Sequence, residues 1–324
     1  MARADRTVPV SARLTGLALT GPGVDRDAEA RTDPGLLGRL LTLPATRVLA
    51  IRDGRLPVTH ADGGTGLAFR APSPADLDAF AIYLGRAAPG PGDRGERTAY
   101  VGVVEAPGAG DHDAGFAGLR SIALSLPPVH GALAATLSAL ANWHATHTHC
   151  PRCGAPTTPV QAGWVRRCAA DGSDHFPRTD PAVIMAVVDA DDRLLLARGR
   201  GFTPTGMSVL AGFVEPGETM AAAVAREVAE EVGVEVADVE YVGDQPWPFP
   251  SGLMVGFRAR ALGTELRLQE GEIEAARWFD RAEFTAALAA GELHISGRLS
   301  ISRRLIEDWY GTEIDVPDAA VRRT

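Results

Sequence analysis

The chain has 324 residues, which is longer than one ordinary domain and enough for about two or three. With 45% hydrophobic and 23% charged residues, its composition is that of a globular protein and excludes a disordered or fibrous chain. The net charge of −9 disfavours extended binding to nucleic-acid phosphates, and no apolar run reaches bilayer length. The N-terminus lacks the apolar core of a secretory signal. We therefore expect a cytoplasmic protein with no membrane partner and no sequence-specific DNA partner.

The first half of the chain contains short apolar segments separated by turns rich in glycine and proline. Residues 46–51 and 98–104 are two such segments, and both indicate strands. Leucines three or four residues apart predict a helix over residues 131–144. We therefore predict a mixed α/β domain over residues 1–148, in which no set of catalytic residues is evident.

All three cysteines lie within one short segment, which is unlike the disulfide framework of a secreted protein. Cys150 and Cys153 form a C-x-x-C turn, and Cys168 begins a second turn. Thiolates at this spacing are typical ligands of Zn²⁺. We therefore predict a structural zinc ribbon over residues 149–178.

The fourth zinc ligand is open to three candidates. Asp171 stands where a second C-x-x-C turn would have its last cysteine, and a carboxylate can ligate zinc. His175 offers better ligand chemistry at a longer reach, and Asp174 lies between them. We take Asp171 as the fourth ligand, and the further alternative is a ribbon that no longer holds metal.

Beyond the ribbon the chain predicts a hairpin, a strand and a helix in succession. Residues 182–188 and 193–197 are apolar and flank a polar turn, as in a β-hairpin. Residues 208–215 are strand-like until a Pro-Gly pair interrupts them. Thr219 is a suitable N-cap for a helix over Met220–Val232.

Three glutamates share one face of this predicted helix. Glu227, Glu230 and Glu231 stand at i, i+3 and i+4, where like charges repel. Such a cluster lowers stability unless a cation neutralises it, and carboxylate oxygens prefer Mg²⁺ or Mn²⁺. A solvated acidic helix face would explain the glutamates but not Gly212 and Glu218 at their spacings. We therefore predict a divalent metal site on this helix.

The segment from Gly212 to Val234 matches the Nudix box, G-x5-E-x7-R-E-U-x-E-E-x-G-U with U aliphatic, at every defined position. Downstream, residues 245–251 read Gln-Pro-Trp-Pro-Phe-Pro-Ser and resemble the proline-aromatic array of NADH pyrophosphatases. With the zinc ribbon, these motifs stand in the order of that family. The chain thus resembles an NADH pyrophosphatase, or NAD⁺ diphosphatase, of the Nudix superfamily. The resemblance implies a C-terminal α/β/α Nudix sandwich over residues 179–324.

The resemblance implies an enzyme in which metal-activated water splits the pyrophosphate bond of NAD(H) to give NMN(H) and AMP. Removal of NAD caps from RNA 5′ ends requires the same bond cleavage and is an alternative. A nucleotide sensor with the Nudix fold but without activity is a third hypothesis, which the intact box disfavours. The family also implies a homodimer.

The resemblance assigns roles to single residues. The catalytic positions are Glu227, Glu230, Glu231 and Arg226, the last as an ion-pairing partner that orients a glutamate. The Mg²⁺ or Mn²⁺ ligands are the carboxylates of Glu227, Glu231 and Glu272 and the backbone carbonyl of Ala211. Glu270 and Glu274 are alternatives to Glu272. The substrate-binding positions are Phe176, Phe213, Gln245, Trp247, Phe249, Ser251 and Ser302.

The chain also departs from the family pattern near the substrate. Gly252 stands where the family presents a hydroxyl to substrate, and Ser251 is the candidate to replace it. Gly163 stands where the family can present an acidic contact. We expect these changes to affect the preference among NADH, NAD⁺ and NAD-capped RNA. Trp247 and Phe249 have the alternative role of anchoring the core, because buried aromatic residues are common.

Overall fold

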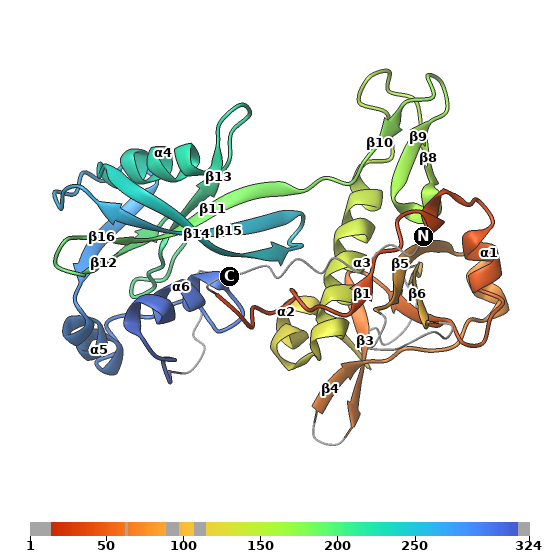
Figure 1. Ribbon diagram of the computed structural model, residues 1–324, viewed down its shortest axis with the longest axis horizontal. Coiled ribbons are helices and arrows are strands. Elements are labelled where there is room, and N and C mark those ends of the chain that lie inside the picture. Colours follow the sequence, from red (N-terminus) through yellow and green to blue (C-terminus); the bar gives the residue numbers. More distant parts are fainter. Residues whose placement is uncertain (1–13, 62–63, 89–96, 107–114, 317–324) are drawn as a thin grey trace, which may run out of the picture. The chain divides into compact units, whose positions relative to one another are not determined.

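The computed structural model describes residues 14–61, 64–88, 97–106 and 115–316 (Figure 1). Its internal contacts divide the chain into two compact units. The N-terminal unit comprises Ala18–Asp180 and Pro246–Leu253, and the C-terminal unit comprises Met1–Leu17, Pro181–Gln245 and Met254–Thr324. Among the described residues, no helix is long and apolar enough to cross a membrane.

The N-terminal unit contains ten strands and three α-helices among the described residues. The strands are β1 (Val24–Asp25), β2 (Arg47–Ile51), β3 (Arg55–Ala61), β4 (Gly64–Leu67), β5 (Phe80–Ala87), β6 (Ala99–Val104), β7 (Phe116–Gly118), β8 (Thr157–Val160), β9 (Val165–Cys168) and β10 (Asp174–His175). The helices are α1 (Leu36–Leu40), α2 (Leu119–Ile122) and α3 (Pro128–Thr146), and the 3₁₀ turns are η1 (Ala30–Thr32), η2 (Pro74–Leu77), η3 (Ala123–Ser125) and η4 (Gln161–Gly163).

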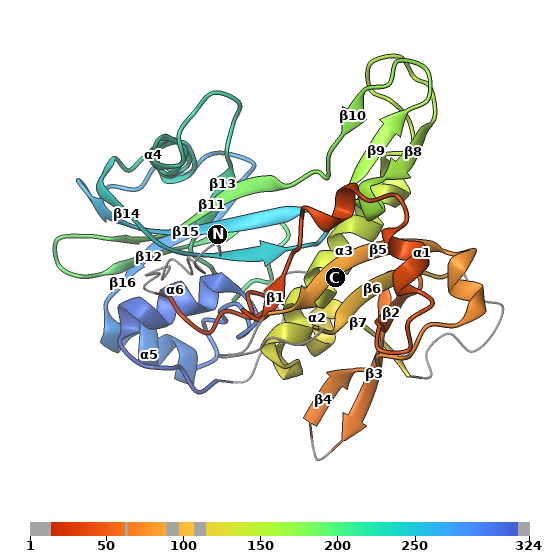
Figure 2. The same ribbon diagram turned by 45° about the vertical axis from the view of Figure 1, so that its right-hand side comes forward.

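A four-stranded sheet of order β1-β5-β6-β2 forms the centre of this unit (Figure 2). The strands β2 and β6 are parallel, and the other pairs are antiparallel. Helix α3 packs onto the sheet so closely that a Cβ at Gly102 would lie 2.4 Å from Cδ1 of Leu137. The predicted helix over residues 131–144 is confirmed as part of α3, which starts earlier because proline is well tolerated in a first helical turn.

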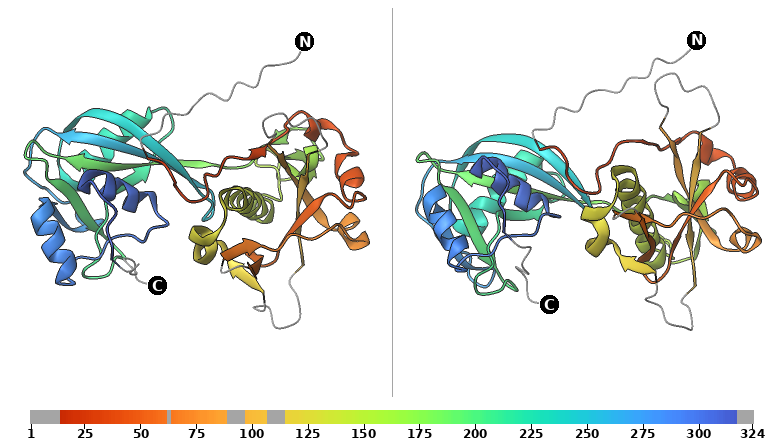
Figure 3. Two further views of the ribbon diagram at one scale, coloured as in Figure 1. Left: turned by 60° about the horizontal axis from the view of Figure 1, so that its bottom comes forward. Right: turned by 90° about the horizontal axis from the view of Figure 1, so that it is seen from below.

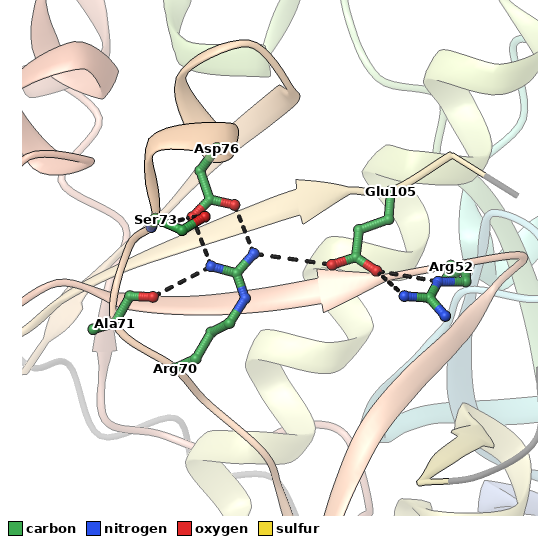
Figure 4. A network of polar contacts seen from close by, with 6 residues as sticks. All are labelled: Arg52, Arg70, Ala71, Ser73, Asp76 and Glu105. Carbon is green, nitrogen blue, oxygen red and sulfur yellow. Dashed lines mark hydrogen bonds and ion pairs between the residues drawn. The ribbon is translucent and has the colours of Figure 1, made fainter. Parts of the chain in front are cut away.

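Edge strand β2 is covered by the segment that carries Arg70 (Figure 4). The backbone of Arg70 exchanges two hydrogen bonds with Val48, at 2.8 and 3.0 Å. Its guanidinium donates to both carboxylate oxygens of Asp76 at 2.6 Å and holds the pKa of that carboxyl at about 2. Arg52 donates to Glu105 at 2.6 Å. The Arg70–Asp76 pair ties the η2 turn to the segment beside β2, and the Arg52–Glu105 pair links the residues that follow β2 and β6.

The zinc-ribbon segment forms a small sheet of order β10-β9-β8 beside the end of α3. Burial lowers the pKa of His144 to about 4, so this imidazole is neutral at neutral pH. His144 contacts the carbonyl of Gly163 through Nε2 at 2.8 Å, and its Nδ1 lies 2.9 Å from the guanidinium of Arg166. A Cβ at Gly163 would lie 3.0 Å from Cγ1 of Ile82. The close packing at this turn is a physical reason for glycine there.

The C-terminal unit is built on one sheet (Figure 3). Its strand order is β14-β15-β11-β12-β16, with β13 paired to β11. Its strands are β11 (Asp180–Val188), β12 (Leu194–Gly199), β13 (Leu210–Phe213), β14 (Val236–Trp247), β15 (Gly252–Ala261) and β16 (Ile273–Phe279). Its helices are α4 (Met220–Val232), α5 (Arg281–Ala289) and α6 (Ile301–Tyr310). The tips of β14 and β15 belong to the N-terminal unit by their contacts.

Both faces of this sheet are covered by helices, which confirms the predicted α/β/α sandwich (Figure 1). Alternate residues of β11, such as Ile184 and Val188, pack in one core with Phe284 of α5 and Leu305 of α6. Helix α4 lies on the opposite face against β13 and β16, where its apolar side chains are buried. The hairpin of β11 and β12 and the helix over Met220–Val232 are confirmed.

Candidate active site

Both ends of helix α4 are fixed by residues of the Nudix box or next to it. The Oγ1 of Thr219 accepts a hydrogen bond from the N–H of Ala222 at 3.2 Å, which caps the first turn. The helix ends at Gly233, whose φ of +72° is a left-handed conformation that glycine adopts without strain. Glu218 accepts a hydrogen bond from the N–H of Glu215 at 2.7 Å and so closes the loop before the helix.

The carboxylate of Glu227 occupies the space above strand β13. A Cβ added at Gly212 would lie 1.9 Å from Cδ of Glu227, far closer than atoms approach in proteins. Only glycine at position 212 therefore allows the carboxylate to lie against the strand. Ala211, whose carbonyl is a predicted metal ligand, is the preceding residue of β13 and pairs with Ile184 of β11.

Arg226 is the centre of an ion-pair network. It donates to both oxygens of Glu218 at 2.6 and 3.1 Å, and to Glu227 and Glu230 at 3.0 Å each. It also donates to the carbonyl of Phe213 at 3.0 Å. The bond with Glu218 is the first cause of a raised pKa of Arg226, so the guanidinium stays charged. These contacts are those of a residue that orients the glutamates.

Glu231 is buried, and among the described residues it forms no ion pair. Its side chain is 7% exposed, and its Oε2 has no hydrogen-bond partner. Burial first, and then the charges of Glu227, Glu272 and Glu230, raise the pKa of Glu231 to about 8. Because an unpaired buried carboxylate is costly, this oxygen points to a cation as its missing partner.

Glu272 is the predicted ligand from outside the box. Its charge is among the causes that raise the pKa values of both Glu231 and Glu227, so the three carboxylates interact. Its neighbour Glu274 pairs instead with Arg198 at 3.3 Å. Carboxylate oxygens, of which Oε2 of Glu231 is buried and unpaired, are the ligand type that a hard divalent cation such as Mg²⁺ or Mn²⁺ prefers.

The predicted substrate residues of the C-terminal unit divide into exposed and buried ones. The ring of Phe213, at the end of β13, is 66% exposed. Gln245 is fully buried, donates to the carbonyl of Leu299 at 2.8 Å and accepts from the N–H of Ile301 at 2.8 Å. Ser302 is also buried, and its hydroxyl lies 2.7 Å from that of Ser208. Gln245 thus holds the start of α6, and direct contact of Gln245 or Ser302 with substrate stays a prediction.

The proline-aromatic loop lies in the N-terminal unit. The rings of Trp247 and Phe249 are half-buried and form an edge-to-face pair with centroids 5.2 Å apart. The guanidinium carbon of Arg120 lies 4.1 Å from the centroid of Phe249 and 5.1 Å from that of Trp247. Ser251 donates to Asp180 at 2.7 Å. Arg120 was not predicted, because nothing in its local sequence distinguishes it from other exposed arginines.

A second unpredicted contact to the loop comes from helix α3. The amide of Asn142 donates to the carbonyls of Pro248 and Pro250, both at 3.3 Å, across more than 100 residues of sequence. Phe176, the other aromatic residue predicted to bind substrate, is 68% exposed in the same unit.

The predicted zinc ligands meet at one point of the ribbon. The ligand atoms of Cys150, Cys153, Cys168 and Asp171 all lie within 4.8 Å of one another. The Sγ atoms of Cys153 and Cys168 are 3.5 Å apart, and Oδ2 of Asp171 lies 3.9 Å from Sγ of Cys150. Ser173 donates to the other oxygen of Asp171 at 2.5 Å and is the first cause of its lowered pKa. Three thiols and an ionised carboxylate fit Zn²⁺.

The two alternative ligands contact other side chains. Asp174 accepts two hydrogen bonds from Arg167, at 2.7 and 2.9 Å. Nε2 of His175 lies 3.2 Å from Oγ of Ser173. The geometry of the ribbon therefore favours Asp171 among the three candidates.

Comparison with known proteins places this chain in a family. Residues 178–297 match the NUDIX domain, and residues 145–176 match the NADH pyrophosphatase zinc ribbon domain. The NAD-capped RNA hydrolase NudC of Mycobacterium bovis is 37% identical over 319 residues, covering 95% of this chain and 96% of that protein. The chain is a Nudix hydrolase of the NADH pyrophosphatase family. The family membership that the motifs predicted is confirmed, and this member of the family is an enzyme.

Further relatives of this NADH pyrophosphatase cover less of the chain. The NAD-capped RNA hydrolase NUDT12 of Homo sapiens is 41% identical over 191 residues, covering 55% of this chain and 41% of that protein. A solved NUDIX hydrolase from Nitrosomonas europaea covers 51% of this chain and 94% of its own, at 21% identity and a TM-score of 0.40.

Proposed function

We propose that the enzyme hydrolyses the pyrophosphate bond of NAD(H) to NMN(H) and AMP. The observation that carries the proposal is the cluster of Glu227, Glu231 and Glu272, in which a buried carboxylate oxygen has no partner. Mg²⁺ or Mn²⁺ bound there would neutralise the phosphate oxygens and lower the pKa of a water molecule. The NudC relative from Mycobacterium bovis is named as a hydrolase of NAD-capped RNA, which supports the choice of NAD(H) as the dinucleotide.

The protein's own side chains prepare this site. Arg226 holds Glu227 and Glu230 in place through charge-assisted hydrogen bonds of 3.0 Å. Glu230 is 54% exposed, so it is accessible to water and suited to help position the attacking molecule. The exposed ring of Phe213 offers a flat surface on which nicotinamide can stack.

NAD-capped RNA is the second candidate substrate, favoured by the names of the bacterial and human relatives. The bond broken is the same, and the difference lies in whether a polynucleotide continues from the adenosine. The chemistry of the carboxylate cluster does not distinguish the two substrates.

Product analysis by chromatography tests the proposal. The pure enzyme is incubated with NADH, ADP-ribose or NAD-capped RNA, each with Mg²⁺ or Mn²⁺ and with a chelator. Metal-dependent release of NMNH and AMP from NADH, with poor cleavage of ADP-ribose, is the expected result. Cleavage of capped RNA alone would move the function to decapping, and nucleotide binding without cleavage would contradict an enzyme.

We also propose that Cys150, Cys153, Cys168 and Asp171 hold a structural Zn²⁺. The ligand atoms already lie together, and Ser173 leaves one oxygen of Asp171 for the metal. The three cysteines are free thiols, as expected for a protein of the reducing cytoplasm, which is the location we propose. A homodimer is proposed by analogy with the family.

A further inference from the structure

Residues 246–253 join two strands of the C-terminal sheet but belong by their contacts to the N-terminal unit. Within this loop, Pro246, Pro248 and Pro250 have no backbone N–H. The N–H of Phe249 bonds to the carbonyl of Trp247 at 2.7 Å, inside the loop itself. The loop therefore has few donors of its own, and its shape depends on groups that other elements supply.

Asn142 of α3 supplies hydrogen bonds to the loop backbone. Its Nδ2 lies 3.3 Å from the carbonyl oxygens of both Pro248 and Pro250, on either side of Phe249. An amide nitrogen has two hydrogens, so one can go to each carbonyl. Asn142 thus fixes the backbone that carries the ring of Phe249.

Arg120 of α2 lies against both aromatic rings of the loop. Its guanidinium carbon lies within 5.1 Å of the centroids of both Trp247 and Phe249, a distance at which a cation attracts the π faces. The two rings meet edge to face, at an interplanar angle of 82°. One cation therefore favours the particular arrangement in which both rings face it.

We propose that Arg120 and Asn142 are positioning residues that hold the Trp247–Phe249 pair for substrate. The inference rests on the proposed function and on the substrate-binding role that the resemblance to NADH pyrophosphatases predicts for these two rings. It assigns a role to the half of the chain in which the sequence shows no catalytic residues.

Steady-state kinetics on NADH test the proposal with matched variants. Arg120→Met removes the charge and keeps most of the length, Arg120→Lys keeps a charge, and Asn142→Asp keeps the shape but cannot donate. Arg277→Met is the control, because Arg277 lies 4.6 Å from the ring of Phe279, outside the loop. Tryptophan emission, compared with that of Trp247→Phe, reports whether the environment of Trp247 changes.

We expect Arg120→Met and Asn142→Asp each to raise KM for NADH by about tenfold while kcat changes little. Arg120→Lys should recover part of the loss, and Arg277→Met should leave KM and the Trp247 emission unchanged. Retained thermal stability in Arg120→Met would separate positioning from folding, since this side chain is exposed.

Trp247→Ala separates failure of the inference from failure of the proposed function. If Trp247→Ala raises KM but Arg120→Met and Asn142→Asp do not, the positioning role is wrong while the loop still binds substrate. If Trp247→Ala itself leaves KM unchanged, the proposed substrate contact of the loop is wrong, and the inference falls with it.

Discussion

Glu231 is the most buried carboxylate of the cluster. Arg226 pairs with three other glutamates, whereas the buried Oε2 of Glu231 has no partner. Without metal, burial and its neighbours raise the pKa of Glu231 to about 8, against an ordinary value of 4.5. The folded protein therefore binds a proton that the unfolded chain releases between these pH values. The stability of the metal-free fold must fall as pH rises through this window.

Glu231→Gln removes this penalty. We expect the metal-free variant to be more stable than the wild type at pH 8, by on the order of 1 kcal/mol or more. Near pH 4.5 the difference should shrink, because Glu231 is then protonated in the folded protein. Urea unfolding in metal-free buffer at both pH values measures this difference in the free energy of unfolding. An equal difference at the two pH values would show that the pKa of Glu231 is not raised in the folded protein.

Gly212 offers a second test at the scale of one atom. Gly212→Ala would place a methyl group 1.9 Å from the carboxyl carbon of Glu227, so Glu227 must move from its position over β13. We expect turnover of NADH to fall by about 100-fold or more. Gly263→Ala is the matched control, because a Cβ at Gly263 meets nothing within 4 Å. Equal activities of the two variants would refute the constraint at Gly212.

Among the elements, helix α4 was predicted to its end residues. Thr219 caps its start and Gly233 ends it, and both signals are local in sequence. The spacing of Glu227, Glu230 and Glu231 then places them on one face without further information. The part of the site that lies in the Nudix box can therefore be predicted from signals that are local in the sequence.

Other parts of the site could not be predicted because they depend on contacts between distant segments. The resemblance suggests Gln245 as a substrate contact, but its bonds to Leu299 and Ile301 at the start of α6 could not be foreseen from the sequence. Arg120 and Asn142 carry no local pattern, and Asn142 reaches a loop more than 100 residues away. The spacing of the second turn already suggested Asp171 among the zinc candidates, but the pairing of Asp174 with Arg167 could not be read from the sequence.

The ribbon provides a test at the same scale. We expect Asp171→Ala to weaken Zn²⁺ binding by about tenfold or more and Asp171→Cys to tighten it, since thiolate is the softer ligand. Asp174→Ala is the control, because Asp174 pairs with Arg167. Competition with a chelator measures the affinity, and the spectrum of the Co²⁺-loaded protein reports the ligands. A larger loss in Asp174→Ala or His175→Ala would identify a different fourth ligand.

At the scale of the whole molecule, the likeness to the mycobacterial relative extends through both units, over 95% of the chain. The N-terminal half thus belongs to the family although its sequence shows no catalytic set. Residues of its helices α2 and α3 contact the proline-aromatic loop. The three-part division at residues 148 and 178 stays a prediction.

The proposed homodimer is also a property of the whole molecule. Sedimentation equilibrium should give a mass of twice 34.0 kDa at micromolar concentration. A single species of 34.0 kDa that is fully active on NADH would contradict the dimer and any contribution of a partner to the site.

The catalytic role of helix α4 is tested most directly by the turnover number of Glu231→Gln on NADH with Mg²⁺ or Mn²⁺, compared with that of the wild type. The variant should fold normally, since it loses only a buried charge, and its kcat should fall by about 100-fold or more because one charge of the metal cluster is gone. Wild-type-like release of NMNH and AMP by the variant would contradict the assignment of α4 as the catalytic helix.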